Sequence, residues 1–192
     1  GSKIGARLFL TERLNASVVL WQLDIDSELL FVGDAGNTED TSAGSERHGL
    51  ELTGYYQIGN SWSVDLEYAY ANSRFETPID GFDDIPGALE HVVSGGIGFQ
   101  RSDGFHGYLR LRHFGDYKLD GGVDAEGSTL LNARLGYAFN DRLSITIDAL
   151  NMLNSNDRDI QYFYESQLRG EPAPVEDRHF HVLEPRAIRA YL

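Results

Sequence analysis

The residues from Trp62 to Ala71 alternate strictly between two kinds of side chain. The apolar set comprises Trp62, Val64, Leu66, Tyr68 and Tyr70. The other set includes two carboxylates, Asp65 and Glu67. Because successive side chains of a strand point to opposite faces, this pattern predicts a β-strand with one apolar and one acidic face. Such a strand suits either a soluble sheet that covers a core or a membrane barrel whose apolar face contacts lipid.

The same alternation predicts further antiparallel strands along the chain. They are expected at residues 4–10, 19–31, 50–56, 91–100, 105–114, 131–139, 143–147, 159–168, 177–181 and 188–192. In the second of these, Trp21 falls in the apolar set, whereas Asp24 and Asp26 fall in the polar set. We therefore expect Trp21 on the apolar face and both aspartates on the polar face. This segment exceeds the roughly five or six residues of an ordinary soluble strand, and it suits a tilted membrane strand.

Two kinds of connection alternate between the predicted strands. Short polar turns are expected near Asn15, Asn60, Asp103 and Asp141. Long acidic or glycine-rich loops are expected at residues 33–44, 74–89 and 115–128. Short turns at one rim and long loops at the other are typical of outer-membrane barrels, whose long loops are extracellular.

The pattern therefore predicts an all-β fold, an antiparallel transmembrane β-barrel meander of roughly nine or ten strands, forming a partial or a small barrel with short periplasmic turns. The aromatic residues at strand ends, among them Trp21, Trp62 and Tyr137, are expected to form an interfacial girdle. A soluble lipocalin-like binder is the alternative, and the strand lengths and the asymmetry of the rims disfavour it.

Composition narrows the possible functions. The chain of 192 residues has no cysteine, which excludes disulfides, thiolate metal sites and cysteine nucleophiles. Its net charge of -14 argues against a nucleic-acid partner, because a phosphate backbone requires a basic surface. No run of apolar residues is long enough for a membrane helix. The chain begins at Gly1-Ser2 without a signal peptide, as expected of a processed or recombinant product or of a fragment.

Several short motifs resemble those of TonB-dependent outer-membrane receptors. Residues 47–52 (R-H-G-L-E-L) resemble the R-x-G-x-E strand signature of that family, and residues 151–154 (N-M-L-N) resemble its N-L-f-N/D element. Further similarities lie at residues 131–137, 162–166, 170–172, 179–181 and 184–186. The resemblance implies that residues 1–192 are a single C-terminal barrel segment without a plug domain, from a receptor of about twenty-two strands.

The resemblance also implies a function and a set of partners. It implies energy-dependent uptake of a scarce nutrient, such as a metal chelate, through the outer membrane of a Gram-negative bacterium. The partners would be outer-membrane lipid and lipopolysaccharide, the barrel-assembly machinery, and in the full-length receptor a plug domain and the TonB energy-coupling complex. The alternative is a small closed barrel that acts as a passive pore, an adhesin or a structural protein, which requires pairing between residues 4–10 and 188–192.

Catalysis is not expected, since the sequence contains neither a Gly-x-Ser-x-Gly elbow nor a serine–histidine–aspartate order, and no cofactor is implied. The glycines Gly95, Gly96 and Gly98 lie inside a strand pattern, where they are expected to let an aromatic side chain such as Tyr68 or Tyr108 pack against the backbone.

The candidate substrate-binding residues lie in the last predicted hairpin. They are Tyr162, Tyr164, His179 and His181. Alternation also places Asp177 on one strand face with both histidines, and this set of ligands suits zinc, copper or iron. The alternative is that the histidines are polar loop residues near the barrel mouth or structural residues that pair with a neighbouring strand.

The acidic strand faces also have two interpretations. Asp24, Asp26, Asp65 and Glu67 are expected to face the interior of the barrel, where Arg110, Arg112 and Arg134 could pair with them. We expect these pairs to stabilise the strand register, and a role in a transport pathway or in contact with a plug is the alternative.

Overall fold

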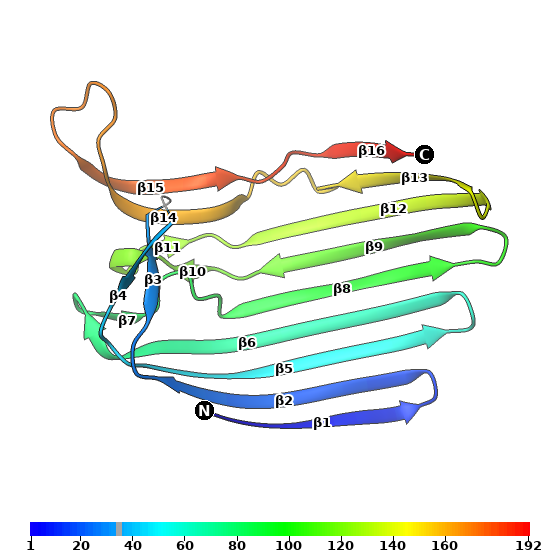
Figure 1. Ribbon diagram of the computed structural model, residues 1–192, viewed down its shortest axis with the longest axis horizontal. Coiled ribbons are helices and arrows are strands. Elements are labelled where there is room, and N and C mark those ends of the chain that lie inside the picture. The colour runs from blue at the N-terminus through cyan, green and yellow to red at the C-terminus, as the bar shows by residue number, and fades with distance from the viewer. Residues whose placement is uncertain (34–35) are drawn as a thin grey trace.

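A computed structural model describes residues 1–33 and 36–192 of the chain. Its main element is a ten-stranded antiparallel sheet in which sequence neighbours pair, so that the chain runs as a meander (Figure 1). The strands on its path are β1 (Ser2–Thr11), β2 (Leu14–Ile25), β5 (Ser45–Ile58), β6 (Trp62–Ile79), β8 (His91–Gln100), β9 (Phe105–Phe114), β12 (Ser128–Asn140), β13 (Leu143–Leu150) and β16 (Ala187–Tyr191), and β7 (Phe82–Asp84) pairs with β6. The predicted all-β meander is confirmed.

The two rims of the sheet differ as the sequence predicts. Tight turns connect strands at one rim, whereas the connections at the other rim are long and carry structure of their own (Figure 1). Their elements are the hairpins β3 (Leu29–Val32) with β4 (Asn37–Asp40), β10 (Tyr117–Lys118) with β11 (Asp124–Ala125), and β14 (Arg158–Ser166) with β15 (Val175–Val182), and the 3-10 turn η1 (Asp120–Gly122). No helix in the described part of the chain could cross a membrane.

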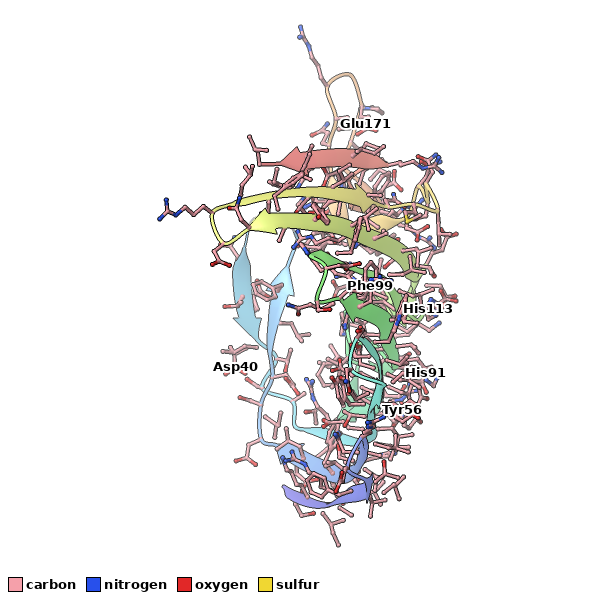
Figure 2. All side chains as sticks on the ribbon, turned by 90° about the vertical axis from the view of Figure 1, so that its right-hand side faces the viewer. Asp40, Tyr56, His91, Phe99, His113 and Glu171 are labelled. Carbon is pink, nitrogen blue, oxygen red and sulfur yellow. The ribbon has the colours of Figure 1, made fainter. Side chains whose placement is uncertain are left out.

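The sheet is curved, and its two faces differ in chemistry. The hairpin β3–β4, which carries Asp40, lies on the side toward which the outer strands curl (Figure 2). We call that side the concave face and the other the convex face. The convex face holds large apolar side chains that are exposed, such as Leu66, which is 56% exposed, and Leu135, which is 54% exposed. Exposed apolar residues over a whole sheet face indicate that the face contacts lipid.

The convex face also carries the aromatic girdle near the short turns. Trp62 packs against Phe99 with ring centroids 5.0 Å apart, and Tyr137 packs against Phe105 at 4.6 Å and Phe139 at 4.8 Å. Aromatic rings near the short-turn rim of a membrane sheet suit the boundary between lipid tails and headgroups.

The few buried apolar side chains of the described residues lie at the long-loop rim. They are Phe75, Ile85, Leu119 and Ala125. Phe75 lies on β6, nearer to the long-loop end of the strand than Tyr70. The other three lie in the long loops. The main sheet therefore relies on lipid to cover its apolar face, whereas the loops pack against one another.

Ion pairs connect strands across the concave face. Arg110 donates to both carboxylate oxygens of Asp65, at 2.7 and 2.8 Å, across the intervening strand β8. Gly96 occupies the position between them, and a Cβ there would lie 3.5 Å from Nε of Arg110. The expected pairing of Asp65 is thus confirmed. The expected role of Gly96 is corrected, since the side chain it accommodates is an arginine rather than an aromatic ring.

A second ion pair involves Asp148, whose role is not predictable from the sequence pattern alone. Arg134 binds Asp148 through two hydrogen bonds of 2.6 Å, and Asp148 is buried. A two-point guanidinium–carboxylate bond fixes the orientation of both groups. It therefore fixes the register of β12 against β13 on this face.

The expectation for residues 19–31 is wrong in two respects. The strand β2 ends at Ile25, and Leu29 and Phe31 belong to the separate hairpin β3–β4. From Val19 onward, the side chains of β2 also lie on the faces opposite to those expected. Trp21 lies on the concave face opposite Gly49, and Asp24 lies on the convex face opposite Glu46.

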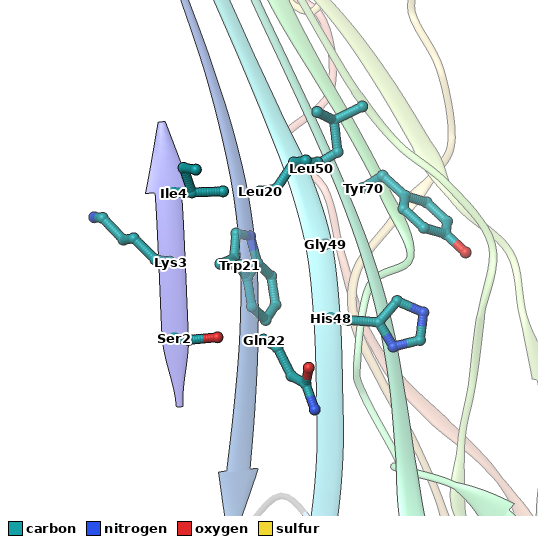
Figure 3. A pocket seen from close by; sticks show the side chains of 10 residues that line it. All are labelled: Ser2, Lys3, Ile4, Leu20, Trp21, Gln22, His48, Gly49, Leu50 and Tyr70. Atoms are coloured by element: carbon teal, nitrogen blue, oxygen red, sulfur yellow. The ribbon is translucent and has the colours of Figure 1, made fainter. Parts of the chain in front are cut away.

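The reason is that residues 18–21 read Val-Val-Leu-Trp, so both faces are apolar there and alternation does not define the side. The polar part of β2 does define it. The hydroxyl of Ser17 hydrogen-bonds that of Thr53 at 2.6 Å on the concave face, and Trp21 is four residues farther on the same face. Its indole lies over Gly49 (Figure 3), where a Cβ would come within 2.6 Å of the ring.

The two edge strands do not meet. Among the described residues, β1 pairs with β2 alone and β16 pairs with β13 alone. A small closed barrel requires hydrogen bonds between these edges, because unpaired backbone groups are costly in lipid. The open sheet therefore has the geometry of part of a larger barrel.

Candidate functional site

The long loops converge over the concave face and form the candidate site. The hairpin β3–β4 spans this side of the sheet (Figure 2), and the hairpin β14–β15 and the turn η1 meet it from the other loops. A Cβ at Gly33 would lie 3.6 Å from the ring of Tyr164, and one at Gly121 would lie 3.8 Å from the ring of Phe163. Three loops that are far apart in sequence thus touch through aromatic rings and glycines.

Two adjoining cavities open between these loops. The larger measures about 610 Å³, and the smaller about 500 Å³. The larger is lined by aromatic and apolar side chains, among them Phe31, Phe114, Tyr117 and Tyr162, together with charged groups from three loops. Cavities of this size, apolar with a few polar groups, are typical of small-molecule sites.

A buried glutamine fixes the hairpin β14–β15 over the larger cavity. The Nε2 of Gln161 donates to the carbonyl of Glu126 at 2.8 Å, and its Oε1 accepts from Arg158 at 3.0 Å. The guanidinium of Arg158 in turn lies 4.6 Å from the ring of Phe180. The role of Gln161 is not predictable from the sequence, because a polar residue in a strand of alternating pattern gives no sign that it is buried.

Asn151 fixes the start of the same loop. It is buried in a left-handed conformation with φ of 46°, and its Nδ2 donates to the carbonyls of Ser155 and Glu184. Its backbone N–H donates to Oδ1 of Asn132. Asparagine tolerates this backbone conformation and supplies both donors and acceptors. This geometry accounts for the asparagine that begins the Asn151–Asn154 motif.

The four candidate substrate-binding residues fall into two groups. Tyr162 lines the larger cavity and Tyr164 the smaller one. The histidines lie on the neighbouring strand and pack against these tyrosines, His179 on Tyr164 with centroids 4.0 Å apart and His181 on Tyr162 at 6.3 Å. The structure therefore brings all four together, with the tyrosines at the cavities and the histidines beside them.

The positions of Asp177, His179 and His181 determine whether these three side chains could bind a metal ion together. Asp177, His179 and His181 share a strand face, but within residues 1–33 and 36–192 no three histidine, aspartate or glutamate side chains are close enough to hold a metal ion. The Nε2 of His179 is buried without a hydrogen-bond partner in the described structure. Metal binding by these residues remains a prediction.

Calorimetry tests that prediction. If zinc or copper binds at the two imidazoles, titration of the wild-type protein gives a saturable heat that His179→Ala/His181→Ala abolishes. The variant His48→Ala/His106→Ala removes two histidines elsewhere and should retain the heat. Equal weak heats from wild type and the His179→Ala/His181→Ala variant would rule out the metal site.

Burial changes the acidity of groups around the larger cavity. Burial raises the pKa of Tyr117, and partial desolvation within the loops raises the pKa of Asp120. By contrast, the Lys118 ammonium, which donates to Asp124 at 2.5 Å, lowers the pKa of that exposed carboxyl.

Residues 3–152 match the family described as "TonB dependent receptor-like, beta-barrel". The chain belongs to this family. TonB-dependent receptors are outer-membrane transporters of Gram-negative bacteria rather than enzymes. No curated protein matches the sequence.

Solved structures of such receptors share the fold of this family segment. One is the closed form of the ferric-catecholate import receptor Fiu from E. coli K12, with 21% identity, a TM-score of 0.68 and coverage of 98% of this chain and 26% of that chain. Another is the siderophore receptor PiuA from Acinetobacter baumannii, with 13% identity, a TM-score of 0.69 and coverage of 98% and 27%.

The copper transporter OprC is a third, with 15% identity, a TM-score of 0.65 and coverage of 98% and 30%. The chain thus spans about a quarter to a third of the length of these proteins. Their names refer to different cargoes, and at these identities the similarity establishes the fold alone.

Proposed function

We propose that residues 1–192 form the C-terminal barrel segment of an outer-membrane receptor that takes up a scarce nutrient such as a metal chelate. The main support for this proposal is the pair of cavities that the long loops form over the concave face. Their place at the extracellular mouth suits capture before passage through the barrel. The convex apolar face supports insertion in the outer membrane, in contact with lipid and lipopolysaccharide.

Transport by the whole receptor requires parts outside this segment. We propose that a plug domain fills the concave interior and that the TonB complex of the inner membrane supplies the energy. The polar concave face supports such an occupant, since Asp65, Arg110 and Arg134 line it with charge. The barrel-assembly machinery would insert the sheet, because its open edges require partners before it can enter lipid.

Tyr162 and Tyr164 are the proposed contacts for cargo, and His179 and His181 are proposed to hold the two rings in place. Aromatic side chains supply large contact areas with few rotatable bonds, and their removal commonly costs about 2 kcal/mol, which corresponds to a roughly thirtyfold loss of affinity.

An uptake assay tests this function. Cells that carry the full-length gene should accumulate more iron or copper under metal limitation than cells that lack it, and a protonophore should abolish the difference. We expect Tyr162→Ala/Tyr164→Ala to lower uptake at limiting supply by about tenfold or more. The matched variant Tyr55→Ala, on the concave face near the short turns, should retain uptake. Accumulation that persists with the protonophore would instead indicate a passive pore.

A further inference from the structure

The unpaired charges at the larger cavity are negative. Asp120 and Asp159 both line it, and neither has an ion-pair partner in the described part of the chain. The two arginines of the lining are engaged. Arg47 donates to Glu28 at 2.6 Å, and Arg158 binds Gln161 and lies 4.0 Å from Glu126. A guest therefore meets free carboxylates but no free guanidinium.

The adjoining smaller cavity continues the same charge. Glu39, Asp80 and Glu176 line it, and within the described residues none of the three has an ion-pair partner. These side chains come from the hairpin β3–β4, the loop between β6 and β7, and strand β15. Carboxylates from three separate loops thus line a cavity that shares Asp120 with the larger one. Like charges that line a concave site reinforce one another and concentrate ions of opposite sign.

The apolar lining adds a second preference that is independent of the carboxylates. Phe31, Phe114 and Tyr162 present aromatic surface to the larger cavity. The faces of aromatic rings carry partial negative charge and attract cations. The rings also favour a guest that has apolar or aromatic surface of its own. Both features point to the same kind of ligand.

We propose that these cavities select a cationic guest with an apolar or aromatic body, such as a positively charged metal chelate, over an anionic chelate. This inference rests on the proposed function of the loops in cargo capture. It sets the chain apart from what its fold alone suggests, because a ferric catecholate is an anion and would meet repulsion from Asp120 and Asp159. The net charge of -14 for the chain acts in the same direction at longer range.

Two tris-chelates of iron of similar shape and opposite charge provide the probes. Tris(bipyridine)iron(II) is a dication and tris(catecholato)iron(III) is a trianion, and both present three aromatic ligands around the metal. Binding to the full-length protein in neutral detergent is measured by calorimetry at low and high salt. We expect the dication to bind at least about tenfold more tightly than the trianion, and its affinity to fall as salt screens the carboxylates.

The carboxylates are then removed without a change of shape. Asp120→Asn/Asp159→Asn should weaken binding of the dication by about tenfold, as expected for the loss of two partly desolvated charges. The matched variant Glu12→Gln/Asp141→Asn changes the net charge by the same amount at the short-turn rim and should leave the affinity unchanged. The comparison of the two probes on the wild type remains decisive even if one variant folds poorly.

The outcomes separate this inference from the proposed function. If the trianion binds as tightly as the dication or more tightly, or if Asp120→Asn/Asp159→Asn keeps full affinity, the charge selection is wrong, but capture by the loops stands. If neither probe binds and Tyr162→Ala/Tyr164→Ala also leaves metal uptake unchanged, both the inference and the proposed function of the loops are wrong.

Discussion

Replacement of Leu66 by arginine is expected to destabilise the barrel by about 2–4 kcal/mol, the cost of an arginine at the middle of a bilayer on the lipid face of a strand. Leu66 is 56% exposed on the convex face, and it lies between the girdle residue Trp62 and the tyrosine Tyr70 on the same strand face. Unfolding by urea in lipid vesicles, followed by the shift of the folded band on gels, measures the change.

The control for this variant is Thr53→Arg. Thr53 lies on the neighbouring strand β5 at nearly the same height, but it faces the concave side, where Glu67 is its cross-strand partner. An arginine there loses the exposed hydrogen bond to Ser17 but remains in a polar setting beside a carboxylate, so its effect should stay below about 1 kcal/mol. Equal losses in both variants would contradict the assignment of the convex face to lipid.

Replacement of Gly49 by alanine is the second large effect that we expect. A Cβ at this position would clash with the backbone carbonyl of Tyr70 and lie 2.6 Å from the indole of Trp21. The carbonyl belongs to the sheet, and the indole lies directly over the glycine with its Nε1 buried, so neither can move freely. Overpacking of this kind costs about 1–3 kcal/mol, which the same unfolding assay should detect.

Gly54 offers the matched control on the same strand. A Cβ there would meet no atom within 4 Å, so Gly54→Ala should be neutral or slightly stabilising through the reduced freedom of the unfolded chain. A Gly49→Ala protein that is as stable as Gly54→Ala would show that Trp21 does not require the glycine.

The fold could be predicted from the sequence wherever polar residues mark one face of a strand. Asp65 and Glu67 identify the concave side of β6, and the turn near Asp141 identifies a rim. In β2 this information is missing at residues 18–21, because four successive apolar residues fit either face. The exchange of Trp21 and Asp24 follows from pairing with β5, which no local pattern encodes.

The candidate site was predictable only in part, for a related reason. Tyr162 and Tyr164 stand out because they alternate with Gln161 and Glu165 in the last hairpin, and both reach the cavities. Gln161 and Asp120 acquire their roles only when three distant loops meet. Contacts between loops depend on tertiary packing, and neither hydrophobic period nor composition reports them.

The position of the buried residues has a consequence for sequence variation. In the lipid-facing wall, a residue such as Leu135 contacts fluid hydrocarbon, so many apolar side chains of different size can replace it. Ile85 and Leu119, in the long loops, instead fit a fixed protein environment, where a change of volume leaves a void or a clash. In this chain, the loops should therefore tolerate changes of side-chain size less well than the strands, the reverse of the trend in most soluble domains.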